Sequence, residues 1–178
     1  DEASNELGAQ IARDFVNRER VVAGLGIVNT GVALASQRHY QNARIPVITS
    51  VATGTLITRQ FQPPEFPQNY VFRVSANDTL QARAIGSFAA SQLGASRYAA
   101  LDDGTPYGKG LADGAAEQLK AEKKEVVVRK SFDDKTTAFD ELAAELKAAN
   151  VEVIVSTLND FQALALLEAL RKVGHTKV

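Results

Sequence analysis

Between residues 98 and 173 the sequence alternates three times between a short apolar run and an amphipathic run, and this alternation restricts the fold more than any other feature. The first apolar run, residues 98–101, is followed by polar residues with glycine and proline. Leu111, Ala115 and Leu119 then recur at the spacing of one helical face. Strands that alternate with helices in this way predict a parallel sheet. The sequence therefore predicts an α/β fold.

The remaining elements follow from the same periodicities. Residues 4–18 place Leu7, Ile11 and Phe15 on one helical face, and Ser4 or Asn5 can cap its first turn. We expect strands at residues 21–23, 46–49, 70–74, 98–101, 126–128 and 151–156. We expect helices at residues 4–18, 32–41, 108–122, 138–149 and 160–173, and one more that Asn77 or Asp78 caps and Gly94 ends.

Several local predictions can be tested by a structure. The glycine-rich residues 24–31 and the hydroxyl-rich residues 50–55 are predicted to be loops. Thr137 is predicted to cap the helix at 138–149. The helix that ends at Gly94 is predicted to bury one face, formed by Leu80, Ala84, Ile85 and Phe88.

Neither half of the chain has enough strands for a closed domain, because a typical sheet has about 5 to 6 strands. The chain also opens on a helix, stops just after another, and contains no methionine, even at position 1. We therefore expect a fragment of a larger protein with two doubly wound parallel-sheet lobes, both incomplete in this chain. The predicted lobe boundary lies near residues 94–96, so that residues 1–95 belong to the first lobe and residues 96–178 to the second.

Composition excludes several classes of function. With a net charge of −1 and basic residues spread along the chain, the sequence offers no basic surface for nucleic acid. The absence of cysteine excludes disulfides, thiolate zinc sites and a cysteine nucleophile. The only histidines, His39 and His175, lie far apart in the sequence, so neither a catalytic triad nor a histidine-rich metal site is evident. We expect no cofactor and no metal.

Polar residues gather where the predicted strands end. In open parallel sheets, ligands bind at the loops that leave the carboxyl ends of the strands. The residues at these positions are Asn29, Thr30, Ser50, Thr53, Thr55, the stretch 102–107, Thr157 and Asn159. Residues of these types also form turns and helix caps, but their shared position predicts a ligand-binding edge.

Three features of these loops leave alternatives open. Asp102 and Asp103 suit acid–base chemistry, a metal site, or the capping of the next turn or helix. Tyr107, between Pro106 and Gly108, either covers a small ligand or packs over its own helix end. Residues 24–31 suggest a dinucleotide-binding loop, but Asn29 occupies the place of the third glycine, which favours a tight turn instead.

Three stretches together resemble the periplasmic leucine/isoleucine/valine-binding protein family of ABC transporters. They are Ile45-Pro-Val-Ile-Thr-Ser-Val-Ala-Thr53, Leu101-Asp-Asp-Gly-Thr-Pro-Tyr-Gly-Lys-Gly-Leu111, and residues 139–155 with Phe139-Asp-Glu-Leu and Asn150-Val-Glu-Val-Ile-Val155. The Tyr-Gly-x-Gly motif that begins at Tyr107 is the most specific of these. The resemblance implies a type I periplasmic-binding-protein fold, in which two hinged lobes close over a ligand in a cleft, without catalysis.

The resemblance also implies which residues bind the ligand. In the first lobe they correspond to Asn29 and Thr30 and to the segment Val51, Ala52 and Thr53. The hydroxyl and backbone N–H groups at Thr53 would hold a carboxylate, and the carbonyl of Val51 would accept from an ammonium group. In the second lobe they correspond to Tyr107 and Asn159. The chain departs from the family at residues 29–31, which are not serine-rich, and at residues 158–160, where the family often has aromatic residues.

The function that follows from the resemblance is that of a solute-binding component of an ABC uptake transporter. Its implied location is the periplasm, and its implied partners are a small-molecule ligand, an amino acid or a small organic acid, and the membrane permease. Three alternatives stay open at this stage. The chain could be a ligand-sensing module of the same fold in a signalling receptor or regulator, a binder of small aromatic acids, or an α/β enzyme that uses Asp102 or Asp103.

Overall fold

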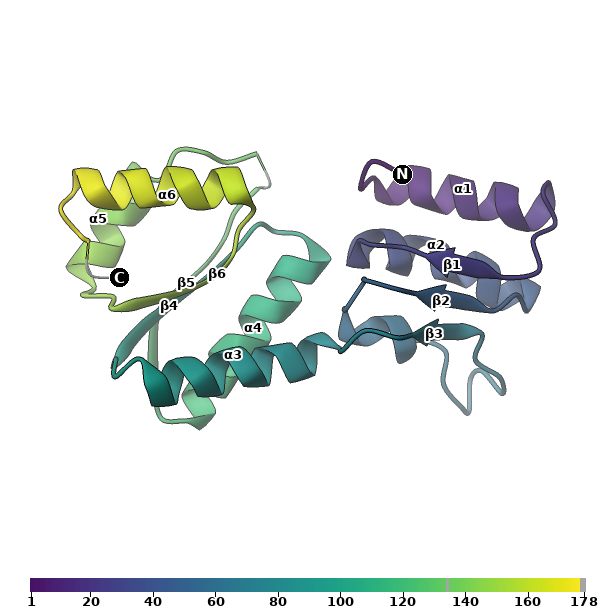
Figure 1. Cartoon of the computed structure of the whole chain (residues 1–178), viewed down its shortest axis with the longest axis horizontal. Helices are drawn as coiled ribbons and strands as arrows, with labels where there is room; N and C mark the ends of the chain where they lie inside the picture. The colour runs from purple at the N-terminus through teal and green to yellow at the C-terminus, as the bar shows by residue number, and fades with distance from the viewer. Residues whose placement is uncertain (134, 177–178) are drawn as a thin grey trace. The chain divides into compact units, whose positions relative to one another are not determined.

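The computed structural model describes residues 1–133 and 135–176, which form an α/β structure whose sheets are parallel (Figure 1). The chain divides into two compact units, Asp1–Asp78 and Thr79–Val178. The helices are α1 (Asn5–Asn17), α2 (Thr30–Ala43), α3 (Asp78–Gln92), α4 (Pro106–Ala121), α5 (Asp140–Ala148), α6 (Asp160–Lys172) and the 3-10 helix η1 (Thr55–Thr58). The strands are β1 (Gly24–Gly26), β2 (Val47–Thr49), β3 (Val71–Arg73), β4 (Arg97–Asp102), β5 (Glu125–Ser131) and β6 (Val153–Thr157).

In the first unit, β1, β2 and β3 form a parallel sheet in sequence order, in which Gly24 pairs with Val47 and Val47 with Val71. The core of this unit joins α1 and α2 to the sheet through the buried side chains Ala12, Ala33, Tyr40, Val47, Ile57, Phe61 and Val71. Helix α1 begins as predicted, because the hydroxyl of Ser4 accepts a hydrogen bond from the backbone N–H of Leu7 at 3.2 Å.

The position of the first strand corrects the sequence prediction. Residues 21–23 were expected to form it, and residues 24–31 were expected to be a loop, but β1 lies at Gly24–Gly26. Pairing with β2 decides this, since Gly24 donates to the carbonyl of Pro46 at 2.8 Å. A side chain at position 24 would bring its Cβ within 3.1 Å of Val47, so glycine allows the close approach here.

In the second unit, β4 lies between β5 and β6, and all three strands are parallel. Helices α5 and α6 cover one face of the sheet, and α3 and α4 cover the other (Figure 1). On the first face, Ala99 and Leu101 pack against Phe139, Leu142, Leu146, Leu166 and Leu170. On the other, Tyr98 and Val155 pack against Ala82, Ala89, Leu111, Ala115 and Leu119. This sheet is therefore doubly wound, as the sequence predicts.

The inner face of α3 differs from the prediction. Leu80 and Phe88 are 56% and 61% exposed, whereas Ala82 and Ala89 are buried. The helix turns its small residues inward because it lies very close to α4: a Cβ on Gly86 would lie 2.7 Å from the side chain of Gln118. Large side chains have no room at this contact.

Helix α3 also bears on where the lobes divide. Its buried residues belong to the core of the second unit, and the two compact units separate after Asp78 rather than near residues 94–96. The assignment of residues 1–95 and 96–178 to two lobes stays a prediction. Gly94 follows α3 with φ of +63°, in agreement with its predicted role in ending the helix.

The start of α5 also differs from the prediction. Its N-cap is Phe139, which makes no side-chain cap hydrogen bond, and not Thr137. Phe139 is 1% exposed and packs edge-on against Phe132, with ring centroids 5.1 Å apart. Burial of this ring fixes where the helix begins, and the cap preference of threonine does not.

Candidate functional site

The candidate residues of the first unit follow β1 and β2. Asn29 has extended backbone geometry at the N-cap of α2, is exposed, and makes no side-chain cap hydrogen bond. Thr30, the first residue of α2, is 4% exposed, and its Oγ1 atom accepts a hydrogen bond from the backbone N–H of Gly54 at 3.2 Å. The hydroxyl of Thr30 therefore joins the two strand-end loops to each other.

The segment 51–53 is held from several sides. Val51 is 52% exposed, whereas Ala52 is buried and donates its N–H to the carbonyl of Ile27 at 3.3 Å. The carbonyl of Thr53 accepts from the backbone N–H of Asp78 at 3.0 Å and from Nη1 of Arg73 at 3.4 Å. Thr53 thus lies in a loop whose backbone is fixed on both sides.

Arg73 and Asp78 form a polar centre that contacts the backbone of this loop. The sequence analysis did not predict this centre. Arg73 also donates from Nη1 to the carbonyl of Gly54 at 2.9 Å. Burial raises the pKa of Asp78, although a hydrogen bond with the side chain of Thr53 and the charge of Arg73 act against the shift. Burial likewise lowers the pKa of Arg73, against the charge of Asp78. An arginine that ends a strand and an aspartate that begins the next helix were the only signal in the sequence.

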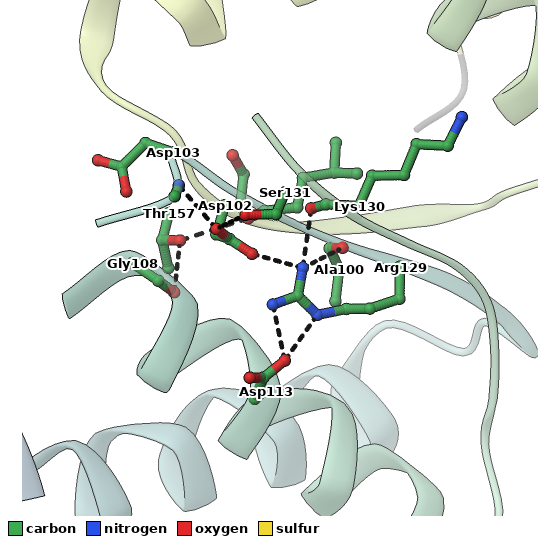
Figure 2. A network of polar contacts seen from close by, with 12 residues as sticks. Ala100, Asp102, Asp103, Gly108, Asp113, Arg129, Lys130, Ser131 and Thr157 are labelled. Atoms are coloured by element: carbon green, nitrogen blue, oxygen red, sulfur yellow. Dashed lines mark hydrogen bonds and ion pairs between the residues drawn. The ribbon is translucent and has the colours of Figure 1, made fainter. Parts of the chain in front are cut away.

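The candidate residues of the second unit surround a row of polar side chains at the carboxyl ends of its strands. Asp102 of β4 is in register with Ser131 of β5 and with Thr157 of β6 (Figure 2). The carboxylate of Asp102 is fully buried, and its Oδ1 atom accepts from Oγ of Ser131 at 2.6 Å and from the N–H of Gly104 at 2.8 Å. Its Oδ2 atom lies 2.5 Å from Nη1 of Arg129.

The turn after Asp102 leads directly into α4. Gly104 has φ of +75°, and a Cβ there would lie 2.6 Å from the carbonyl oxygen of Phe132, so the turn requires glycine. Asp103 accepts from the N–H and the hydroxyl of Thr105 at 3.0 and 2.7 Å, and Thr105 caps α4 by accepting from the N–H of Gly108 at 3.0 Å. Helix α4 therefore begins at Pro106 and not at residue 108.

This start of α4 changes the position of Tyr107. The sequence placed Tyr107 on an exposed loop, but it lies in the first turn of the helix, where the residue is 38% exposed. Thr157 adds a further contact by donating its hydroxyl to the carbonyl of Gly108 at 2.9 Å. Tyr107 is thus presented from a regular, capped helix end at the carboxyl edge of the sheet.

Asn159 caps α6. Its side chain accepts from the N–H of Gln162 at 3.0 Å, and its own N–H donates to the side chain of Gln162 at 3.4 Å, which completes a capping box. Gln162 is fully buried and donates from Nε2 to the carbonyl of Asp133 at 2.9 Å. The side-chain oxygen of Asn159 is therefore engaged in the structure of its own helix.

The polar contacts of Asp102 and Asp103 favour structural roles for both. Asp102 has no exposed surface and is paired with Arg129, while Asp103 organises the turn before α4. In residues 1–133 and 135–176, no group of three or more His, Cys, Asp or Glu side chains is arranged to hold a metal ion. Both aspartates thus have structural contacts, and the enzyme alternative of the sequence analysis stays a prediction that these contacts do not test.

Within each unit, the structure places the candidates at the carboxyl ends of the strands. Asn29, Thr30, Val51, Ala52 and Thr53 lie at adjoining loops of the first unit, and Tyr107 and Asn159 follow β4 and β6 of the second. A cavity of about 180 Å³ in the first unit is lined mainly by apolar residues of α1, α2 and β1, and no predicted ligand residue lines it. None of the described helices is long and apolar enough to cross a membrane.

The curated proteins that match this chain are homologues of leucine/isoleucine/valine-binding proteins. A leucine/isoleucine/valine-binding protein homologue of Brucella abortus (strain 2308) is 26% identical over 155 residues, which are 86% of this chain and 40% of the relative. The chain thus spans about two fifths of the length of the curated relatives it matches, and both lobes are incomplete in it.

Solved structures share the fold. The leucine-binding protein LivK of Thermotoga maritima superposes with a TM-score of 0.77 at 24% identity, over 85% of this chain and 41% of LivK. A solute-binding protein of an ABC transporter from R. palustris, in complex with 4-hydroxybenzoate, has a TM-score of 0.80 at 23% identity, over 98% of this chain and 46% of that protein. LivJ of Streptococcus pneumoniae, in complex with isoleucine, has a TM-score of 0.79 at 22% identity, over 99% of this chain and 48% of LivJ.

The sequence profile of the periplasmic binding proteins matches residues 1–178, the whole of the chain. The fold agrees with that match, because parallel sheets carry polar strand-end loops in both units. The chain belongs to the periplasmic binding protein family.

Proposed function

We propose that this chain is part of a solute-binding component of an ABC uptake transporter and that it binds an amino acid, branched-chain or related. The observation that carries the proposal is the placement of the candidate residues. In both units they follow the carboxyl ends of parallel strands, the edge at which open α/β sheets bind ligands. The leucine/isoleucine/valine-binding homologues support an amino acid as the ligand.

The proposed contacts divide the ligand between the two units. Thr53 and the carbonyl of Val51 would hold the carboxylate and ammonium groups, and Tyr107 would cover the ligand from the second lobe. Thr53 suits this role because the backbone of its loop is held by Asp78 and Arg73, so little conformational freedom is lost on binding. A ligand that contacts both lobes favours their closed arrangement, because it binds that arrangement more tightly than the open one.

The proposed setting is the periplasm, and the proposed partner is the membrane permease of the transporter. The closed, ligand-bound protein would be the form that the permease recognises. No catalytic step belongs to this function. Asp102 and Asp103, the carboxylates that the enzyme alternative would use, take part in the ion pair and the turn described above.

A small aromatic acid is the second candidate ligand. Proteins of the same fold have been solved in complex with 4-hydroxybenzoate and with benzoate, and they superpose on this chain as well as the amino-acid-binding ones do, with TM-scores of 0.80 and 0.82. These ligands share the carboxylate with amino acids but lack the ammonium group. An amino acid would donate a hydrogen bond from its ammonium group to the carbonyl of Val51, and a benzoate has no ammonium group to do so. This contact therefore distinguishes the two classes of ligand.

Thermal melting of the full-length protein tests the proposal. A ligand that binds only the folded state raises the melting temperature in proportion to the logarithm of its concentration. We expect a saturable rise with L-leucine, L-isoleucine or L-valine that Thr53→Ala and Tyr107→Ala abolish. A rise only with benzoate or 4-hydroxybenzoate would show that the ligand is a small aromatic acid and not an amino acid. No rise with any of the five compounds would reject the proposal.

A further inference from the structure

Arg129 of β5 joins the end of strand β4 to helix α4 (Figure 2). Its Nη1 atom pairs with the buried Oδ2 of Asp102 at 2.5 Å. Its Nε and Nη2 atoms both donate to Oδ1 of Asp113, in the second turn of α4, at 2.9 and 2.7 Å. The guanidinium group of Arg129 therefore connects the buried carboxylate of Asp102 with α4, the helix that carries Tyr107.

Each nitrogen of the Arg129 guanidinium group contacts an acceptor within the protein. Beyond the two aspartates, Nη1 also donates to the carbonyl of Lys130 at 2.8 Å. Burial acts to lower the pKa of Arg129, but its hydrogen bonds to the carboxylates of Asp113 and Asp102, together with their negative charges, outweigh this effect and raise the pKa. Because every nitrogen is engaged within the protein, Arg129 acts on the position of its neighbours and not on a ligand directly.

The first turn of α4 is fixed from the other side by the strand ends. Thr105 accepts from the N–H of Gly108, and Thr157 of β6 donates to the carbonyl of the same residue. Asp113 lies six residues beyond Tyr107, about one and two-thirds turns along the helix. The contacts of Gly108 and Asp113 therefore bracket the part of α4 that presents Tyr107.

We propose that Asp113 and Arg129 are positioning residues for Tyr107. They hold the first two turns of α4 against the sheet, so that the tyrosine ring is presented in one orientation and pays little entropy when the ligand binds. This inference rests on the proposed function, in which Tyr107 contacts the ligand. It assigns ligand affinity to two side chains that do not touch the ligand.

Asp113→Ala is the variant that tests the inference, because Asp113 is half exposed and its loss leaves no buried group unpaired other than one end of Arg129. Glu145→Ala is the matched control. Glu145 pairs with Lys130, the next residue on the same strand, but its helix is α5, which packs on the face of the sheet opposite to α4. Both variants are made in the full-length protein.

Amide hydrogen exchange in the ligand-free protein gives the first result. We expect Asp113→Ala to speed exchange across residues 104–109, which include the N–H groups of Gly104 and Gly108, and Glu145→Ala to leave these residues unchanged. Equal exchange in the wild type and in Asp113→Ala would overturn the inference. This readout needs no ligand, so it stands even if the proposed function fails.

A double-mutant cycle with L-leucine as the probe gives the second result. We expect Asp113→Ala to weaken L-leucine binding by about 3- to 10-fold when Tyr107 is present and by less than about 2-fold on a Tyr107→Ala background. Equal losses on both backgrounds would mean that Asp113 acts on general stability, and would overturn the inference. If the wild type does not bind L-leucine, the proposed ligand is wrong, and the exchange result alone decides whether Asp113 holds the turn.

Discussion

Ala82 of α3 and Gly114 of α4 pack so closely that a Cβ on Gly114 would lie 2.8 Å from the Cβ of Ala82. This contact explains why α3 buries its small residues and exposes its large apolar ones. It also places α3 in the core of the second unit, although the chain reaches α3 directly from the first.

Gly114→Ala should therefore destabilise the second unit. Overpacking a close helix contact costs about 1 to 3 kcal/mol of unfolding free energy, which exceeds the gain in helix propensity of up to about 1 kcal/mol. Gly110→Ala is the control in the same helix, because a Cβ there meets nothing within 4 Å and should be neutral or stabilising. Urea unfolding of both variants measures the difference, and equal midpoints would contradict the close contact.

Asp102→Asn should destabilise the protein because it leaves Arg129 without its buried partner. Breaking a buried ion pair by removing one partner costs about 3 to 5 kcal/mol, and we expect the lower end because the side chain of Arg129 is 27% exposed. Asp140→Asn, which breaks a pair with Lys172 at 3.5 Å between two largely exposed side chains, should cost less than about 1 kcal/mol. If the two variants unfold at the same urea concentration, Asp102 does not have the role described.

Glu152 should make stability depend on pH in the acid range. Its carboxylate accepts from the backbone N–H groups of Ser96 and Arg97 at 2.7 and 3.0 Å, and these bonds lower its pKa from the ordinary value of 4.5. Because the folded pKa lies below the unfolded one, this stabilisation is present above pH 4.5 and is lost as the pH falls through the folded value.

The variant Glu152→Gln should remove that part of the pH dependence. Melting temperatures measured between pH 7 and pH 3 should fall less steeply for Glu152→Gln than for the wild type. Glu168→Gln, an exposed change on α6, serves as the control. If the melting temperatures of Glu152→Gln and the wild type fall equally with pH, the hydrogen bonds from Ser96 and Arg97 do not favour the charged form of Glu152.

Asn159→Ala should reveal whether Asn159 serves the helix or the ligand. Loss of a capping box residue costs about 0.5 to 2 kcal/mol of unfolding free energy. If the capping box is its role, the affinity for a ligand found in the melting panel should change by less than about 2-fold. A loss of more than about 10-fold in affinity, with stability unchanged, would restore the predicted ligand contact.

Local sequence patterns anticipated much of the second unit. Strand β4 could be recognised because its residues 98–101 are all apolar and, in the structure, fully buried on both faces. The N-cap at Ser4 and the end of α3 at Gly94 could be recognised because they depend on a few neighbouring residues. Such features are local, so no knowledge of distant contacts is needed to predict them.

One error occurred where a distant residue decides the local structure, and another where a local helix cap was overlooked. Strand β1 lies at Gly24-Leu25-Gly26 because Gly24 pairs with Val47, although the adjacent Val21 and Val22 were a better local strand signal. Tyr107 lies in a helix because Thr105, held by Asp103, starts α4 two residues earlier than the apolar pattern suggested.

The sequence by itself determined the alternation of strands and helices, the parallel sheets and the positions of Thr53 and Tyr107 at strand ends, because hydrophobic periodicity and turn residues act over a few positions. Only the tertiary structure decided the inner face of α3, the polar centre of Arg73 and Asp78, and the ion pairs that join Asp102, Arg129 and Asp113. Each of these features depends on contacts with residues distant in the sequence, as when Arg73 and Asp78 hold the loop at Thr53, and a buried charge is stable only when the fold brings its partners to it.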